Sequence, residues 1–232
     1  MGCALVLLPG LDGTSVLFRP LVASLPAEVE PITVAYPPGV PLGYSQLLDL
    51  VLAAAPPGPF VLLGESFSGP LAVMAAATRP VGLRGLILCA TFVTCPVPLV
   101  PRWARHLARP WLFRLYPALG YLRFLLSRAA SAELRSLASE ALASVRPAVL
   151  AHRVREVVGV DVAALLAGYT GQALYLRGRQ DWVVPRSAMQ AVLRANPSIE
   201  RLEVPGPHMV LQSNPTAAAD GIARFIKRVG TD

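Results

Sequence analysis

The chain has 232 residues, of which 54% are hydrophobic and only 15% are charged. This composition excludes an intrinsically disordered chain and predicts one large globular domain with a sizeable buried core. The formal net charge of +7 comes from 20 Arg and one Lys against 14 acidic residues, but no run of basic residues of the nucleic-acid-binding type occurs, so we expect no nucleic-acid partner.

The first predicted element is a short apolar strand at residues 4–8. The apolar run that contains it lacks a basic leader and ends at Pro9-Gly10, so it is too short for a signal peptide or a membrane span. We therefore expect a cytoplasmic protein.

The chain has three cysteines, Cys3, Cys89 and Cys95, an odd number without a C-x-x-C pair. This pattern argues against a disulfide framework and against a zinc site. The expectation is three free thiols buried in strands.

Short apolar runs and helical patterns alternate along much of the chain. The predicted strands are residues 4–8, 32–36, 60–63, 86–90, 173–176 and 201–204. The predicted helices are residues 16–25, 44–55, 67–78, 186–195 and 215–229. This alternation is typical of an α/β protein with a mostly parallel six-stranded sheet and helices on both of its faces.

The alternation stops between residues 91 and 168, where no convincing strand occurs. Two sets of apolar residues there have helical spacing: Leu112, Leu115, Leu119, Leu122 and Leu126, then Leu134, Leu137, Ala141 and Val145. We therefore predict a core made of residues 1–90 and 169–232, with an inserted helical cap at residues 91–168. Residues 96–150 contain eight Arg and only two acidic residues, so nearly all the excess positive charge falls in the predicted cap.

The strongest chemical signal is the segment Gly64-Glu65-Ser66-Phe67-Ser68, where a predicted buried strand runs directly into a predicted helix. A serine at such a sharp turn projects its hydroxyl above the edge of the sheet, near the positive end of the helix. The positions two residues away must be small, because the strand and the helix approach closely there. The segment resembles the G-x-S-x-G nucleophile elbow of the α/β-hydrolase family, with Ser68 in place of the second Gly and Gly69 directly behind it.

The resemblance covers essentially the whole chain and implies an α/β-hydrolase fold. The family usually has two further strands before the strand that we predict first, so the expected sheet is a compact six-stranded version.

A serine hydroxyl is a weak nucleophile at neutral pH and needs a base within hydrogen-bonding reach. His106 and His152 fall in the predicted cap beside arginines and are interpreted as solvated or structural residues. His208 follows the last predicted strand, and the carboxyl ends of strands border the crevice of an open α/β sheet. We therefore predict that His208 is the general base for Ser66.

The third member should be an acid that orients the imidazole. Asp181 follows the predicted strand 173–176, again at a carboxyl end. Asp161 is the main rival, but it precedes an apolar helical segment and has the position of a helix N-cap. The order Ser66, Asp181, His208 is also the order of α/β-hydrolases and differs from that of chymotrypsin and subtilisin.

Acyl transfer also needs hydrogen-bond donors for the developing oxyanion. The Gly-rich turn Pro9-Gly10-Leu11-Asp12-Gly13 follows the first predicted strand and is similar to the oxyanion loop of the family. The resemblance implies that the backbone N–H groups of Leu11 and Phe67 form the oxyanion hole. Taken alone, the turn fits equally well an ordinary strand-to-helix connection in which Asp12 caps the next helix.

These residues predict a serine carboxylesterase that cleaves small-molecule carboxylic esters of short to medium acyl chain through an acyl-enzyme intermediate. Ser66 attacks the acyl carbonyl, His208 takes and returns the proton, and Asp181 orients His208. The scheme needs no metal and no organic cofactor. A serine at the elbow disfavours the dehalogenases and epoxide hydrolases of the family, which use an Asp nucleophile.

The predicted cap suggests the substrate and the alternatives. Its aromatic residues favour an apolar acyl pocket: Trp103, Trp111, Phe113, Tyr116, Tyr121 and Phe124. The main alternative is an acyl thioesterase whose Arg102, Arg105 and Arg109 contact the phosphates of coenzyme A or of an acyl carrier, although their spacing also fits a solvated helix face.

Two other classes remain open. A non-catalytic binding module could share the fold. The basic, Trp-containing cap could also contact a membrane surface, although most such stretches are cap helices packed on a core.

Overall fold

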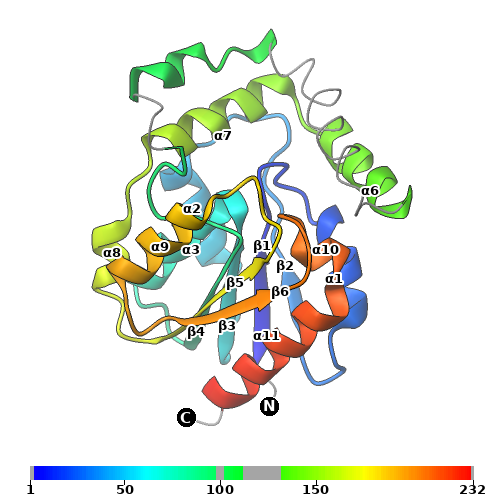
Figure 1. The fold of residues 1–232 in the computed structure, drawn as a ribbon, viewed down its shortest axis with the longest axis vertical. Coiled ribbons are helices and arrows are strands. Elements are labelled where there is room, and N and C mark those ends of the chain that lie inside the picture. Colours follow the sequence, from blue (N-terminus) through cyan, green and yellow to red (C-terminus); the bar gives the residue numbers. More distant parts are fainter. Residues whose placement is uncertain (1–2, 98–101, 112–131, 231–232) are drawn as a thin grey trace.

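The computed structural model describes residues 3–97, 102–111 and 132–230. Its centre is one sheet of six parallel strands in the order β2-β1-β3-β4-β5-β6 (Figure 1). The strands are β1 (Ala4–Leu8), β2 (Pro31–Thr33), β3 (Phe60–Glu65), β4 (Leu83–Cys89), β5 (Gln172–Gly178) and β6 (Glu200–Val204). Every neighbouring pair in this order is parallel, so the predicted α/β fold with a six-stranded sheet is confirmed.

The strand order reverses direction once. The chain runs from β1 outward to the edge strand β2, then returns to the other side of β1 to form β3. In open α/β sheets, ligands bind at such a switch point, outside the carboxyl ends of the strands. The carboxyl ends of β1 and β3 therefore mark the expected place of the site.

Helices connect the strands of the core. They are η1 (Val16–Phe18), α1 (Arg19–Ser24), α2 (Tyr44–Ala53), η2 (Ser66–Ser68), α3 (Gly69–Ala77), α9 (Arg186–Ala195), α10 (Val210–Ser213) and α11 (Pro215–Val229). The predicted helices 186–195 and 215–229 have the observed bounds. The predicted helix 16–25 is divided into η1 and α1.

One strand is shorter and earlier than predicted. The sequence predicts residues 32–36, whereas β2 covers Pro31–Thr33. The N–H of Tyr36 donates to the carbonyl of Gly13 at 2.8 Å, so the chain leaves the sheet to contact the loop after β1.

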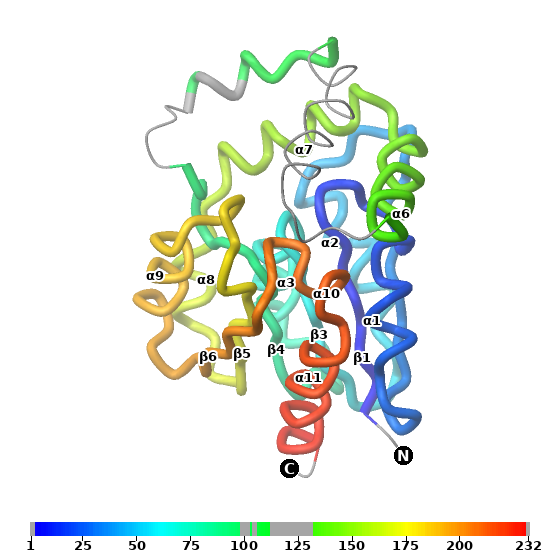
Figure 2. Tube along the Cα trace, turned by 45° about the vertical axis from the view of Figure 1, so that its right-hand side comes forward, coloured from blue at the N-terminus to red at the C-terminus, as the bar shows by residue number. Residues whose placement is uncertain are grey.

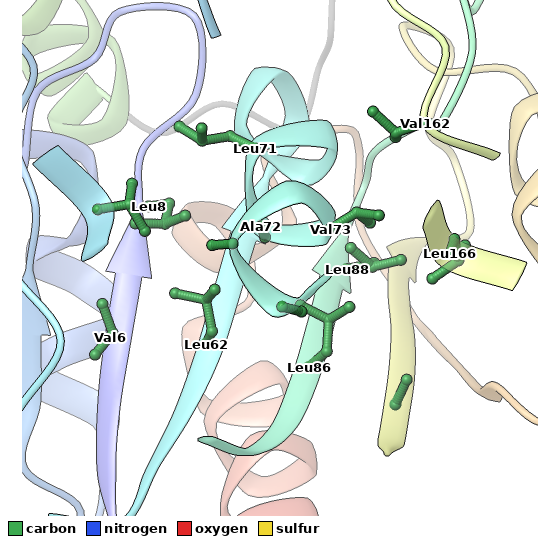
Figure 3. Packing of buried hydrophobic residues seen from close by; sticks show 14 of the residues in the cluster. Val6, Leu8, Leu62, Leu71, Ala72, Val73, Leu86, Leu88, Val162 and Leu166 are labelled. Atoms are coloured by element: carbon green, nitrogen blue, oxygen red, sulfur yellow. The ribbon is translucent and has the colours of Figure 1, made fainter. Parts of the chain in front are cut away.

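Side chains alternate between the two faces of the sheet, and each face has its own hydrophobic cluster. On one face, Val6, Leu62 and Leu86 pack with residues of α2, α3, α8 (Ala163–Ala167) and α9 (Figure 3). On the other face, neighbouring strand residues such as Leu7 and Ile87 pack with α1, α10 and α11. Because both faces are covered, β1 and β3 are buried at every position, whereas the edge strands β2 and β6 also carry exposed residues.

Between β4 and β5 the structure describes the helices η3 (Arg102–Leu107), α6 (Ala132–Ala143), α7 (Pro147–Gly159) and α8. Residues 90–97 are not helical, and Thr94 forms an isolated antiparallel bridge with Asp161. Figures 1 and 2 show α7 above the carboxyl ends of the strands, whereas α8 lies beside α9. The Leu112–Leu126 pattern lies outside the described residues. The division into core and cap stays a prediction.

The three cysteines are free thiols, and Cys3 and Cys89 are buried. Cys95 differs from the expectation, because it is only half-buried and follows the end of β4. Within the described part of the chain, no helix is both long and apolar enough to cross a membrane.

Candidate active site

Ser66 is the first residue of η2 and lies at the sharp turn that directly follows β3. Its φ of 50° lies in the left-handed region that few non-glycine residues adopt. A Cβ atom added to Gly64 would lie 2.5 Å from the carbonyl oxygen of Ser68 and 2.8 Å from Cβ of Ala72. The small residue two positions before the serine is therefore required by the close approach of strand and helix, as the sequence predicts.

Ser68 stands where the elbow motif has its second glycine. Its φ of −86° is ordinary for any residue, so the turn does not need glycine at this position. The Ser68 hydroxyl donates to the carbonyl of Pro9. Because that hydroxyl has only one proton, the phenol of Tyr36 acts as donor to Ser68 Oγ at 2.6 Å. Ser68 thus joins the elbow to the loop after β1.

The side chains of Ser66, His208 and Asp181 form a continuous hydrogen-bonded chain. His208 Nε2 lies 3.0 Å from Ser66 Oγ, and His208 Nδ1 lies 3.0 Å from Asp181 Oδ2. The other carboxylate oxygen of Asp181 accepts hydrogen bonds from the N–H groups of Val183 at 2.9 Å and Val184 at 3.0 Å. Three residues that are far apart in sequence therefore meet at one edge of the sheet.

The surroundings of Asp181 in this hydrogen-bonded chain favour its ionised form. The side chain of Asp181 is only 1% exposed, and this burial alone raises its pKa. The hydrogen bond and the charge interaction with His208, together with the two backbone donors, outweigh burial and lower the pKa of Asp181 below its usual value. An ionised Asp181 keeps the proton of a neutral imidazole on Nδ1, which leaves Nε2 free to accept the proton of Ser66.

The loop after β1 lies beside the serine. A Cβ atom added to Gly10 would be 3.9 Å from Cβ of Ser66. The N–H of Gly13 donates to the carbonyl of Gly10 at 3.0 Å, so Leu11 and Asp12 are the central residues of a tight turn. The Asp12 carboxylate accepts hydrogen bonds from Thr14, through its N–H at 2.8 Å and its hydroxyl at 2.6 Å.

Phe67 is the second residue of η2, and N–H groups in the first turn of a helix have no partner within that helix. Leu11 and Phe67 thus belong to the two segments that flank Ser66. Their role as oxyanion donors stays a prediction.

The rival residues lie elsewhere. Asp161 is exposed and accepts a hydrogen bond from the N–H of Ala163 at 3.2 Å, next to the start of α8. The observed N-cap is Val162, so the predicted N-cap, Asp161, lies one residue before it. His106 and His152 line a cavity of about 640 Å³ that is bounded by residues of α2, η3 and α7.

A buried carboxyl group directly before the serine was not predicted as a site residue. Glu65 is the last residue of β3, and its Oε1 accepts a hydrogen bond from Gln212 Nε2 of α10 at 2.9 Å. Burial raises the pKa of Glu65 to about 7; Gln212 and the charge of His208 oppose the rise, and the charge of Asp12 adds to it. No signal in the sequence links Glu65 to Gln212, because the motif leaves the position before the serine free.

Two further contacts hold the backbone of the elbow and were also missed. The hydroxyl of Thr91 donates to the carbonyl of Ser66, and the phenol of Tyr44 donates to the carbonyl of Phe67 at 2.9 Å. Tyr175 in turn donates to the carbonyl of Thr91 at 2.6 Å. The acceptors in these contacts are backbone carbonyls, which every residue has, so no residue type in the sequence marks them.

In the ranges that the structure describes, no three His, Cys, Asp or Glu side chains gather closely enough to hold a metal ion.

Comparisons with known proteins identify the family to which this parallel α/β sheet belongs. Residues 5–220 match the model of the alpha/beta hydrolase family. A pimeloyl-[acyl-carrier protein] methyl ester esterase of Xylella fastidiosa is 31% identical over 226 residues, covering 88% of this chain and 87% of the relative. A protein with the same name from Xanthomonas oryzae pv. oryzae is 29% identical, covering 98% of this chain and 96% of the relative.

Among solved structures, a thermophilic esterase from Thermogutta terrifontis superposes with a TM-score of 0.80 at 20% identity, covering 99% of this chain and 91% of that one. The chain belongs to the α/β-hydrolase family. Within the family, it is an enzyme that hydrolyses carboxylic esters.

Proposed function

We propose that Ser66, His208 and Asp181 are the catalytic triad of this ester hydrolase. The observation that carries the proposal is the hydrogen-bonded chain from Ser66 Oγ through His208 to Asp181, with both contacts to the imidazole at 3.0 Å. Each residue lies at the carboxyl end of a strand, and the chain order is that of the family.

In the proposed mechanism, Ser66 Oγ attacks the ester carbonyl carbon while its proton moves to His208 Nε2. The tetrahedral oxyanion receives hydrogen bonds from the N–H groups of Leu11 and Phe67. The bond to the alcohol oxygen then breaks, and the alcohol leaves with the proton from His208. Water, activated by the same imidazole, releases the acid from the acyl-enzyme.

Labelling with a fluorophosphonate probe tests the nucleophile. The native protein is expected to lose activity as one probe molecule attaches to Ser66. Ser66→Ala is expected to stay unlabelled and to lower kcat for a p-nitrophenyl ester by at least about 10⁴-fold. Equal labelling of both proteins would show that another residue is the nucleophile.

For the substrate, we propose a carboxylic ester of short to medium acyl chain. Support comes from the relatives, whose name specifies a methyl ester of a pimeloyl group on an acyl carrier protein. Of the aromatic residues expected to line an acyl pocket, Trp103 and Trp111 are 65% and 60% exposed, and the others lie outside the described residues. A chain-length series of p-nitrophenyl esters tests the proposal, which predicts the highest kcat/KM at short or medium chains.

Acyl thioester hydrolysis is the second candidate. The cavity between η3 and α7 favours it, because Arg109, one of the arginines predicted to contact phosphate, lines the cavity with two histidines against one acidic residue, Glu156. The guanidinium of Arg155, which also borders the cavity, donates to the carbonyl of Ala108, so Arg109 is the proposed phosphate contact. A methyl ester of pimeloyl carrier protein contains both bonds, since the carrier holds its acyl group as a thioester. Methanol release with the carrier still loaded supports the ester, whereas a free carrier thiol supports the thioester.

We also propose that the protein acts in the cytoplasm and does not bind membranes. Co-sedimentation with vesicles that contain anionic lipid is expected to be absent at physiological salt. Salt-sensitive binding to such vesicles would contradict this proposal and favour contact through the basic cap.

A further inference from the structure

Arg153 of α7 reaches the loop after β1 from 142 residues further along the chain. Its Nη1 donates hydrogen bonds to the carbonyl oxygens of Leu11 at 2.9 Å and Asp12 at 2.8 Å. These are the two central residues of the turn between Gly10 and Gly13. One guanidinium group therefore binds the carbonyls of both central residues of that turn.

The turn is shaped to admit this guanidinium. Gly13 has a φ of 68°, and a Cβ atom added to it would lie 2.6 Å from Cζ of Arg153. The guanidinium carbon also lies 5.6 Å from the centre of the Tyr36 ring, and the N–H of Tyr36 donates to the carbonyl of Gly13 at 2.8 Å. A side chain at position 13 would therefore collide with the Arg153 guanidinium, and glycine lets the guanidinium approach the backbone of the turn.

Burying this arginine is costly. Arg153 is only 1% exposed, and its Nε is buried without a hydrogen-bond partner among the described residues. Its acceptors are backbone carbonyls, because the nearby carboxylate of Asp12 is held by Thr14. An apolar side chain of similar length would fill the same space without the cost of a buried charge. What the guanidinium adds is the pair of hydrogen bonds to the turn, the contact with the Tyr36 ring and a charge interaction with the Asp12 carboxylate.

We infer that Arg153 is a positioning residue for ester hydrolysis, which orients the Leu11 N–H toward the developing oxyanion by fixing the turn between Gly10 and Gly13. The inference rests on the proposed function, because the role of Leu11 is part of it. Oxyanion donors stabilise the transition state only when they are already aimed at it, since a loop that must rearrange during the reaction loses that advantage.

The same helix supplies a matched control. Arg155, two residues further along α7, donates to the carbonyl of Ala108 through Nε at 3.1 Å and Nη2 at 2.7 Å. It therefore fastens α7 to the segment after η3, which is not part of the loop after β1. Arg153→Met and Arg155→Met each remove a guanidinium from one helix, but only the first releases the turn.

The experiment measures kcat and KM for a p-nitrophenyl ester in the native enzyme and in Arg153→Met, Arg153→Lys and Arg155→Met. Arg153→Met is expected to lower kcat by about 10-fold to 100-fold, because a misplaced Leu11 N–H stabilises the oxyanion less well. KM is expected to stay within about threefold. Arg153→Lys is expected to retain more kcat than Arg153→Met, since an ammonium also donates to carbonyls. Arg155→Met is expected to keep kcat within about threefold.

The affinity for a transition-state analogue is a second measurement, which a general loss of folding stability would not change. A trifluoromethyl ketone forms a tetrahedral adduct with the serine, and its affinity is expected to fall in Arg153→Met by the same factor as kcat/KM. If Arg155→Met loses as much kcat as Arg153→Met, or if Arg153→Met raises KM at unchanged kcat, the inference is wrong. If Arg153→Met does not fold, Arg153→Lys carries the same comparison, with a loss of kcat at constant KM expected.

Hydrogen exchange separates this inference from the proposed function. The amides of residues 10–14 are expected to exchange faster in Arg153→Met than in the native protein, with no such change in Arg155→Met. Unchanged exchange in Arg153→Met would overturn the inference even in a fully active enzyme. Faster exchange in a protein whose Ser66→Ala variant retains full activity would instead overturn the proposed function and leave the anchoring of the turn intact.

Discussion

Two buried carboxyl groups beside the serine, Glu65 and Asp181, differ in pKa because they differ in hydrogen-bond donors. Burial raises the pKa of both. Asp181 receives hydrogen bonds from His208 and from two backbone N–H groups, which lower its pKa below the usual value. Glu65 receives its described hydrogen bond from the neutral amide of Gln212, and its pKa stays raised, at about 7. One carboxylate is therefore fixed as an anion, and the other titrates near neutral pH.

Asp181→Asn should reduce kcat far more than it raises KM. The amide cannot stabilise the imidazolium, and it favours the wrong tautomer of His208, so we expect a loss in kcat of about 10⁴-fold. Steady-state kinetics with a p-nitrophenyl ester measures both constants. Asp161→Asn, at the exposed start of α8, should leave both nearly unchanged; a larger loss in that variant would show that the acid is misassigned.

Glu65 should make folding stability depend on pH. Its pKa is about 7 in the folded protein and near the ordinary value of 4.5 in the unfolded chain. Between these values the folded protein binds more protons than the unfolded chain, so the free energy of unfolding falls as the pH rises and levels off above about 7. The decrease is at most about 3 kcal/mol.

Urea unfolding at pH 5 and pH 8 measures this dependence. Glu65→Gln cannot ionise, so its free energy of unfolding should fall less between the two pH values than that of the native protein. Glu30→Gln, which removes an exposed carboxylate, should keep the native dependence. An equal decrease in the free energy of unfolding between pH 5 and pH 8 in all three proteins would show that Glu65 does not ionise between these pH values.

At the scale of elements, the elbow depends on how closely α3 packs against β3 and β4. The backbone of Ser66 has a φ of 50°. Its carbonyl accepts a hydrogen bond from Thr91, which follows β4, and the carbonyl of Phe67 accepts one from Tyr44 of α2. Gly69 leaves room for the side chain of Thr91, and Gly64 leaves room for the carbonyl of Ser68. The turn is therefore kept in place by α2 and by the segment after β4.

Gly64→Ala should destabilise the protein through this packing. The added methyl group would meet a backbone carbonyl at 2.5 Å, which the helix can relieve only by moving away from the strand. We expect a loss of at least about 2 kcal/mol in the free energy of unfolding, measured by urea titration. Gly58→Ala is the matched control, because its new methyl group meets nothing within 4 Å, and a change above about 0.5 kcal/mol there would contradict the packing argument.

At the scale of the whole molecule, one sheet carries two hydrophobic clusters. Adjacent residues of β4 divide between them: Leu86 belongs to the cluster under α3, and Ile87 belongs to the cluster under α11. Neither side chain is exposed. Because the two layers share every strand, we expect them to unfold together.

Leu86→Ala and Ile87→Ala test this coupling. Each should lower the free energy of unfolding by about 2 to 5 kcal/mol, the cost of removing a large buried aliphatic side chain. Circular dichroism and tryptophan fluorescence during urea unfolding should give one coincident transition in both variants. Two separated transitions in either variant would show that the layers unfold independently.

The sequence by itself determined the features that depend on local pattern. Apolar runs alternating with helical patterns are enough to predict a parallel sheet covered on both faces, and the bounds of α9 and α11 follow from the same periodicity. The candidate triad could be proposed because a serine at a strand-to-helix junction, with His208 and Asp181 after later strands, leaves few other choices. All of these signals are carried by residues close together in the chain or by their order.

Only the tertiary structure decided the contacts that join distant segments through the backbone. Arg153 on the turn at Leu11 and Asp12, and Ser68 on Pro9, bring together residues that are up to 142 positions apart. Carbonyl acceptors are present at every residue, so such partners have no signature in the sequence. Strand 32–36 was misplaced for the same reason, since Tyr36 leaves the sheet to bond with Gly13.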